Sequence, residues 1–197
     1  MILWRTKLIS FVIARARFWQ KYRRALIVAL LCFTSTACKS EEKKDQIPLA
    51  QAPVTHLRST SELQWGLMGI KKLDPERVFL FHLDHTRYAR VWMFNVFVDL
   101  SAAFIDKNGV ITEIHHLKSY PEKMDPKRPI KKWDDFQLYP LNDPIITFFH
   151  NESIASKNKV DFILETPPNW FQENNIKTGD FIKLNKNKNL LYFYSNH

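Results

Sequence analysis

Short runs of β-branched and aromatic residues, each ended by polar or turn-forming residues, recur along the chain. Such runs are typical of strands, and they predict strands at 77–83, 88–100, 102–105, 110–117, 160–165 and 181–184, with an added edge strand at 190–194. No strand–helix–strand spacing typical of a parallel sheet is recognised. The pattern therefore predicts a mainly β fold of the α+β class with two short helices: a compact β-barrel or sandwich of short, mostly antiparallel strands.

Two segments carry helix signals and one carries a turn signal. Ser59 and Glu62 have capping-box spacing, which predicts a helix over 59–68, and a second helix is predicted over 167–175, with proline near its start. The sequence Asp106-Lys107-Asn108-Gly109 lies between two apolar runs. Asn-Gly there predicts a two-residue hairpin turn with positive φ at both central positions.

Five prolines lie between residues 120 and 144, together with charges of both signs. Because proline removes a backbone donor from a sheet, this composition predicts a long excursion on the surface over 119–159.

The N-terminal region has the pattern of an export signal. Residues 1–24 are basic, residues 25–33 are uninterruptedly apolar, and small residues lead to Cys38. The apolar run is far shorter than the roughly 20 residues that span a bilayer, so we predict a signal peptide over 1–37. Small residues before the cysteine resemble a bacterial lipobox, which implies lipidation of Cys38; the alternative is an ordinary signal peptide with an incidental cysteine. A polar tether over 38–56 would then precede a single domain at 57–197.

Charge supports this division of the chain. The 197 residues carry a formal net charge of +9, from 29 basic and 20 acidic residues. Seven of the basic residues lie before residue 38, where no acidic residue occurs, so 22 basic and 20 acidic residues remain. The exported part is thus close to neutral, and nucleic acid is not an expected partner. We expect localisation at a bacterial membrane, facing the periplasm or the cell surface, with the lipid as anchor.

The residue types alone suggest two kinds of site, a metal site and a hydrolase site. His82, His85 and His115 are weak candidates for a zinc or copper site, although ordinary surface histidines are the favoured interpretation. Asp106, Glu113 and Glu165 could serve a hydrolase, provided that two of these carboxylates face one cleft about 5–10 Å apart. The sequence supplies no such distance.

Five motifs follow one another in the chain: Gly66-Leu67-Met68, Trp92-Met93-Phe94-Asn95, 103–110 (AFIDKNGV), 163–167 (ILETP) and 175–180 (NIKTGD). In this order they resemble the domain of unknown function 192 (DUF 192) family, which has Gly-Leu-Met, Trp-Met-Lys-Asn-Thr, a Phe-Ile-Asp hairpin, Leu-Glu-Leu-Pro and Gly-Asp motifs. The resemblance implies a compact, mainly β domain, often exported, with no established activity. This chain departs from the family at four positions. Phe94 and Val96 stand where the family has lysine and threonine, and Asp99 and Ser101 stand where proline and aspartate are usual in the family.

Trp92 and Asn95 belong to the motif that anchors this resemblance. They could line a ligand pocket together with Glu113 and Glu165, or Trp92 could fill the core while Asn95 satisfies a buried backbone group, which is the favoured alternative. We predict an envelope lipoprotein that acts as a non-catalytic binding or accessory module for a small molecule or envelope component, with no cofactor. The alternatives are a hydrolase acting on envelope polysaccharide or peptide, and a periplasmic metal handler.

Overall fold

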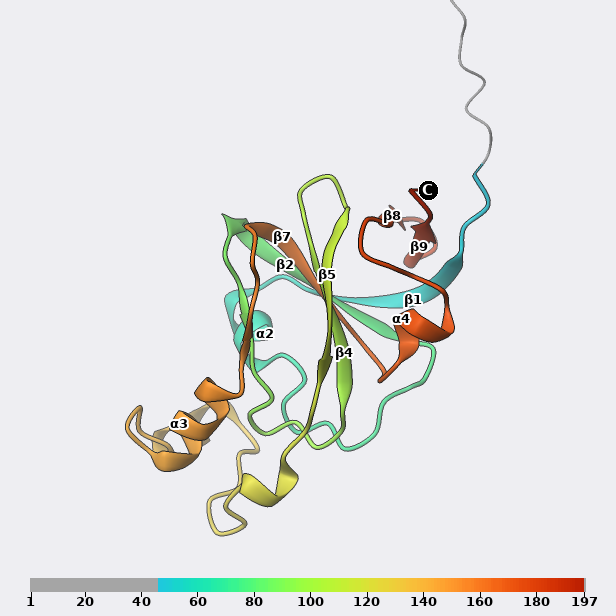
Figure 1. Ribbon diagram of the computed structural model, residues 1–197. Helices are drawn as coiled ribbons and strands as arrows, with labels where there is room; N and C mark the ends of the chain where they lie inside the picture. Colours follow the sequence, from blue (N-terminus) through green and yellow to red (C-terminus); the bar gives the residue numbers. More distant parts are fainter. Residues whose placement is uncertain (1–45, 197) are drawn as a thin grey trace, which may run out of the picture. The chain divides into compact units, whose positions relative to one another are not determined.

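The computed structural model describes residues 46–196 (Figure 1). The predicted signal peptide and Cys38 lie outside the described residues. The strands are β1 (Ala50–Leu57), β2 (Val78–Arg87), β3 (Arg90–Val91), β4 (Leu100–Ile105), β5 (Ile111–Leu117), β6 (Ile154–Ala155), β7 (Val160–Thr166), β8 (Phe181–Asn185) and β9 (Leu190–Tyr194). The helices are α2 (Thr60–Trp65), α3 (Pro144–Asn151) and α4 (Trp170–Glu173), with 3-10 turns η1 (Pro121–Lys123) and η2 (Trp133–Leu138).

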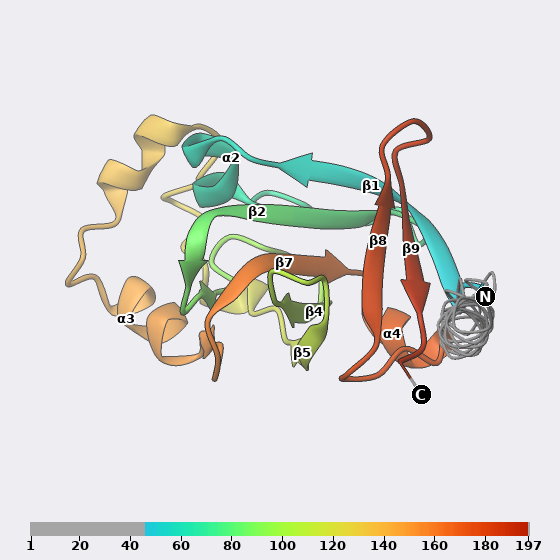
Figure 2. The ribbon, with the colours of Figure 1, turned by 90° about the horizontal axis from the view of Figure 1, so that it is seen from above.

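Seven strands form one sheet in the order β5-β4-β7-β2-β1-β9-β8, while β3 and β6 pair separately. Every neighbouring pair in the large sheet is antiparallel except β1 and β2, which run parallel and are joined through α2. This crossover corrects the sequence-based view that no strand–helix–strand unit is present. In Figure 2 the β8–β9 hairpin runs across the direction of β2 and β7, so the sheet curls strongly.

The two outer strands of the sheet meet at the hairpin between β4 and β5. Val110 bridges Phe181, the amide of Ile111 donates to the carbonyl of Asp180 at 2.8 Å, and the amide of Ile182 donates to that of Gly109 at 2.9 Å. These bonds join the start of β5 to β8 and partly close the sheet into a barrel. The predicted mainly β, mostly antiparallel fold class is thereby confirmed.

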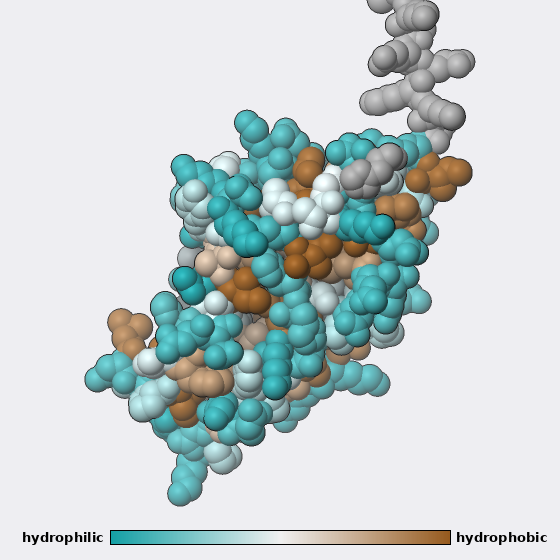
Figure 3. Space-filling model, viewed as in Figure 1, coloured by the Kyte–Doolittle hydropathy of each residue, from teal (hydrophilic) through white to brown (hydrophobic). Residues whose placement is uncertain are grey.

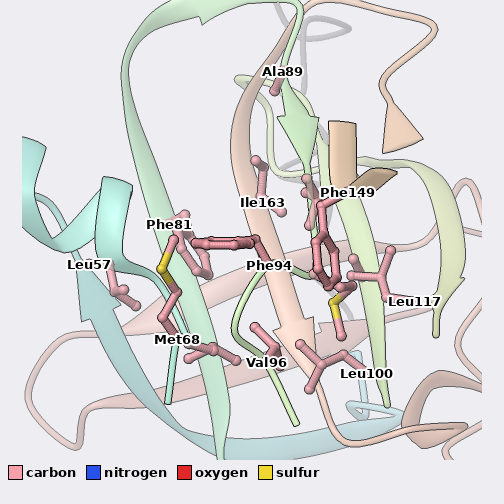
Figure 4. Packing of buried hydrophobic residues seen from close by; sticks show 14 of the residues in the cluster. Leu57, Met68, Phe81, Ala89, Phe94, Val96, Leu100, Leu117, Phe149 and Ile163 are labelled. Carbon is pink, nitrogen blue, oxygen red and sulfur yellow. The ribbon is translucent and has the colours of Figure 1, made fainter. Parts of the chain in front are cut away.

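Each face of the sheet carries its own apolar core. One core contains Val54, Leu80, Leu164 and Phe193 and is covered by Trp170 and Phe171 of α4. The other, shown in Figure 4, contains residues such as Phe81, Phe94, Phe149 and Ile163. All six residues of β4 are buried, because this strand has an apolar core on both sides. Hydrophilic side chains dominate the outer surface in the view of Figure 3, and apolar side chains emerge in patches near its centre.

The predicted surface excursion at 119–159 contributes to the second core. Ile130, Tyr139 and Phe149 are buried, and α3 was not predicted. Pro144 occupies the start of α3, where its missing N–H costs nothing, and Asp143 caps the helix by accepting from the amide of Ile145. Prolines in this segment therefore occupy the first positions of helical turns. A high proline content alone is not enough to predict an irregular surface segment.

Three further expectations need correction. The predicted tether at 38–56 overlaps β1, whose Ala52 and Val54 are buried in the sheet, so the folded domain begins before residue 57. The predicted strand at 88–100 reduces to β3, and an irregular segment follows in which Asn95 has φ +57°. Its apolar content reflects burial beneath the excursion, not pleating. Likewise 190–194 is not an edge strand, since β9 lies between β1 and β8.

Among the described residues, no helix is long and apolar enough to cross a membrane.

The hairpin at Asp106–Gly109 forms as predicted in place but with a different geometry. Only Gly109 has positive φ, at +83°, and its amide donates to the carbonyl of Asp106 at 3.0 Å. The Asp106 carboxylate accepts from the amides of Asn108 and Val110 at 2.8 and 2.9 Å. This is a turn with a bulge at the glycine. A second irregularity, the register shift between Phe104 and Ile105, lies further along the hairpin.

We expect Gly109→Ala to destabilise the fold more than Gly69→Ala. Both glycines have positive φ, at +83° and +82°, so both alanines lose about 1–2 kcal/mol to backbone strain. A Cβ at Gly109 would also lie 2.8 Å from the carbonyl oxygen of Ile182, whereas a Cβ at Gly69 meets nothing within 4 Å. The contact should add about 1–2 kcal/mol to the loss in unfolding free energy, measured by urea denaturation. Equal losses for the two variants would show that the barrel closure does not constrain this site.

Candidate functional site

A cavity of about 520 Å³ lies over the face of the sheet that carries Ile163. Its floor is formed by β2, β4 and β7, and its walls by α2, by the segment from residue 87 to 96 and by η2. The lining is predominantly apolar and rich in aromatic rings, which are Trp65, Phe81, Tyr88, Trp92, Phe94, Trp133 and Phe136. Volume and lining are those of a small-molecule site.

The helix α2 is placed over the cavity by its own sequence. Ser59 and Glu62 form the predicted capping box, in which the Ser59 side chain accepts from the Glu62 amide and the Glu62 carboxylate accepts from the Ser59 amide. Gly66 ends the helix with φ +53°, and a Cβ at this position would lie 3.4 Å from the Phe81 ring. The chain can therefore turn closely over β2 and bury Leu67 in the core.

The excursion supplies the opposite wall through a chain of aromatic contacts. Phe136 meets the Trp65 ring edge-on at 6.2 Å between centroids, and it lies 5.1 Å from Trp133 and 6.0 Å from Phe94. Trp92 stacks on Phe94 at 5.2 Å with an interplanar angle of 28°. Rings from three separate segments thus enclose the cavity. Of these rings only Trp92 was predicted from the sequence; Trp65, Trp133 and Phe136 were not, because their proximity depends on how the excursion folds back.

Glu165 of β7 lines this cavity from the sheet. It lies opposite Ala102 of β4 and Phe79 of β2, on the same face as Ile163. Its side chain is 6% exposed and, within residues 46–196, makes no hydrogen bond or ion pair. Burial raises the pKa of the Glu165 carboxyl to about 8, because no neighbouring donor or cation offsets the loss of water. The group is therefore mostly protonated at neutral pH.

The other charged groups of the cavity lie toward its mouth. Arg87 lies with its Nε 3.6 Å from the Asp84 carboxylate, and Arg90 donates from Nη1 to the hydroxyl of Ser153 at 2.6 Å. Tyr88 between them is 62% exposed. Each arginine already has a polar partner outside the cavity, and Glu165 is left without one.

Trp92 and Asn95 do not face a common site. Trp92 lines the cavity over Glu165, whereas Asn95 lies beside a second hollow of about 600 Å³ near Met124 and Ile130. Asn95 is buried, donates from Nδ2 to the carbonyl of Ile130 at 3.2 Å, and accepts at its own carbonyl from the amide of Gly69 at 2.7 Å. Its geometry matches the alternative in which Asn95 satisfies a buried backbone group.

The carboxylates that could serve a hydrolase do not converge. Glu113 accepts from the amide of Lys157 at 2.7 Å and lies 3.0 Å from Nε2 of His115. Burial raises the pKa of Glu113, but these hydrogen bonds outweigh it and leave the pKa below its ordinary value. Asp106 holds the hairpin turn, and of the three only Glu165 lines the cavity. The structure therefore brings no two of these three carboxylates into this cavity.

The candidate metal ligands are also kept apart. His82 lies opposite Phe162, whereas His115 lies opposite Ala102, and these partners belong to opposite faces of the sheet. His85 is exposed beside Asp84, and within residues 46–196 no group of three potential metal ligands is present. His82 instead contacts His56, with 2.8 Å between Nε2 and Nδ1, and burial lowers its pKa to about 4. The sequence analysis missed this pair because His56 fell within the predicted tether.

We expect Glu165→Gln to change how stability depends on pH. The folded pKa of about 8 exceeds the ordinary value of 4.5, so the folded state holds a proton that the unfolded state has lost between these pH values. The stabilisation is complete below pH 4.5 and is lost as pH rises through 8. The variant lacks this loss, so its unfolding free energy relative to the native protein should rise by about 2–4 kcal/mol from pH 5 to 8.

Urea denaturation at pH 5, 6, 7 and 8 measures this difference. Glu173→Gln, in α4, is the matched control and should follow the native protein at every pH. A constant difference between Glu165→Gln and the native protein would contradict burial of an unpaired carboxyl.

Comparisons with known proteins bear on the family. The chain matches a sequence profile of DUF192, described as "Uncharacterized ACR", over residues 41–135. No curated protein matches it. Among solved structures, a putative transcription regulator from Sinorhizobium meliloti is 22% identical with a TM-score of 0.48, covering 65% of this chain and 78% of that one. A protein of unknown function from Novosphingobium aromaticivorans is 16% identical with a TM-score of 0.49, covering 67% and 74%.

At these identities and TM-scores neither structure carries an argument about function. The two last motifs of the resemblance, at 163–167 and 175–180, lie beyond the matched residues. The profile match supports the assignment of residues 41–135 to this uncharacterized family.

Proposed function

We propose that this chain is an exported, lipid-anchored envelope protein whose β domain binds a small molecule in the cavity over Glu165. One observation carries the binding role. A carboxyl that is 6% exposed and without a polar partner within residues 46–196 lines an aromatic-walled cavity of about 520 Å³. Binding sites combine such an apolar lining with very few polar groups, and those groups orient the ligand.

A binding role accounts for the site better than a catalytic one. Glycoside hydrolysis of the usual kind needs two carboxylates across a cleft, and Glu165 stands alone among the acidic residues at this cavity. Glu113 does not line the cavity, and its carboxylate contacts His115 and accepts from the Lys157 amide. Metal handling likewise lacks a set of three ligands within the described part of the chain.

The proposed anchoring rests on the sequence. Small residues precede Cys38, and a run of charged residues follows it. Since β1 begins at Ala50, residues 39–49 would link the lipid to the sheet. A polar linker of this kind keeps a folded domain in water beside a membrane.

Cysteine substitutions test the anchor. In a bacterial host given labelled palmitate, Cys38→Ser should abolish incorporation of the label and release the protein from the membrane fraction. Cys32→Ser changes the other cysteine of the chain, lies before the proposed cleavage site and should leave both measurements unchanged. Equal labelling of the Cys38→Ser and native proteins would contradict lipidation at this residue.

A fragment screen by saturation-transfer NMR tests the cavity. We expect fragments that bind the native protein and lose at least tenfold in affinity with Trp65→Ala, because this ring forms part of the cavity wall. Tyr192→Ala removes a half-buried aromatic ring from β9, away from the cavity, and should leave these fragments bound. If no fragment depends on Trp65, the binding function is wrong.

A further inference from the structure

We infer that the ligand of this cavity is an organic cation, an amine or quaternary ammonium with an aromatic or apolar body, whose nitrogen lies against the Glu165 carboxylate. The inference rests on the proposed binding function and names the chemistry of its ligand.

The charge distribution around the cavity favours a single buried cation. Arg87 of β2, Tyr88 and Arg90 of β3 are the other charged or titratable side chains of its lining. The other elements that line the cavity, which are α2, β4, η2 and the segment 92–96, contribute none of the described charged or titratable side chains. His115 of β5 lies across β4 on the same face of the sheet, outside the lining, with its Nε2 3.0 Å from the Glu113 carboxylate. Among residues 46–196, Glu165 is therefore the only acidic side chain that lines this cavity.

The hydrogen-bonding capacity of Glu165 is wholly unused within the described residues. An ionised carboxylate accepts about four hydrogen bonds, and this one accepts none from the protein. Its ionised form is costly without a counter-charge, and a bound ammonium supplies both the charge and the donors. An anionic ligand would instead require the arginines at the mouth, which already engage Asp84 and Ser153.

The aromatic walls reinforce the same choice. Trp65 of α2, Trp92 after β3 and Phe81 of β2 all line the cavity. The face of an aromatic ring attracts a cation, and tryptophan does so most strongly. The same rings would contact the apolar body of the ligand, so carboxylate and rings together select a cation with apolar substituents.

Proton release accompanies this binding. The ligand enters already charged, and the protonated Glu165 gives its proton to solvent as the carboxylate–ammonium pair forms. Because the raised pKa of Glu165 lies at about 8, affinity for the cation should rise roughly tenfold from pH 6 to 7 and about fivefold from pH 7 to 8. A neutral ligand would show no such rise.

Three probes of similar size separate the possibilities: 2-phenylethylamine, which is cationic over this range, neutral 2-phenylethanol, and anionic phenylacetate. Their affinities for the full exported chain are measured by saturation-transfer NMR at pH 6, 7 and 8. We expect the amine to bind at least tenfold more tightly than the alcohol at pH 8, with phenylacetate weakest. Glu165→Gln, which keeps the shape of the side chain, should remove the advantage of the amine and its dependence on pH. Glu173→Gln should retain both.

Failure of this inference differs from failure of the binding function. If the alcohol or phenylacetate binds as tightly as the amine at pH 8, or if Glu165→Gln keeps the preference, a cationic ligand is overturned. The same holds if none of the three probes binds while the Trp65-dependent fragments are neutral or anionic. If no fragment depends on Trp65, the binding function itself falls, and the ligand class falls with it. Glu165→Leu provides a second variant, which should lose the preference for the amine without introducing a polar group.

Discussion

The central strands of this sheet have two buried faces, and each face needs a cover. All six residues of β4 are buried, and Ile163 and Leu164 of β7 belong to different cores. One face is covered by the curled sheet itself and by α4. The other is covered by α2, by the irregular segment after β3 and by the excursion, which are far apart in sequence. The cavity over Glu165 lies between these three segments.

Phe94 shows how the excursion and the sheet depend on each other. This residue stands where the family resemblance expects a lysine, and it is fully buried against Phe136, Tyr139 and Phe149 of the excursion. A lysine at this depth would need a partner, whereas a phenylalanine needs apolar neighbours, and the excursion provides three rings. The apolar residue at position 94 and the excursion that packs on it therefore form one structural solution.

The sequence predicted the elements whose apolar pattern is set by the sheet alone. β5, β7 and the capping box before α2 were found because their signals are local. The segment 88–100 was mistaken for a strand because burial beneath another segment produces the same apolar run as burial within a sheet. Glu165 was recognised as a candidate, but its isolation was not, since that depends on strand register and on segments that close over it. Pairing of Glu113 with the Lys157 amide joins residues 44 positions apart, beyond the reach of any local pattern.

The isolation of Glu165 connects stability with binding. Phe94 and Glu165 line the same cavity, so a lysine at position 94 would place its stem in the wall of the cavity that holds the acid. With phenylalanine there, position 94 supplies no cation to Glu165, and protonation is what lets the fold tolerate the buried group. The free energy of unfolding therefore falls as pH rises, because the carboxyl becomes ionised inside an apolar cavity. A bound cationic ligand would supply the counter-charge that a phenylalanine cannot. It would stabilise the fold most at the pH where the ionised, unliganded Glu165 destabilises it most. Ligand affinity and the free energy of unfolding then both depend on the ionisation of Glu165.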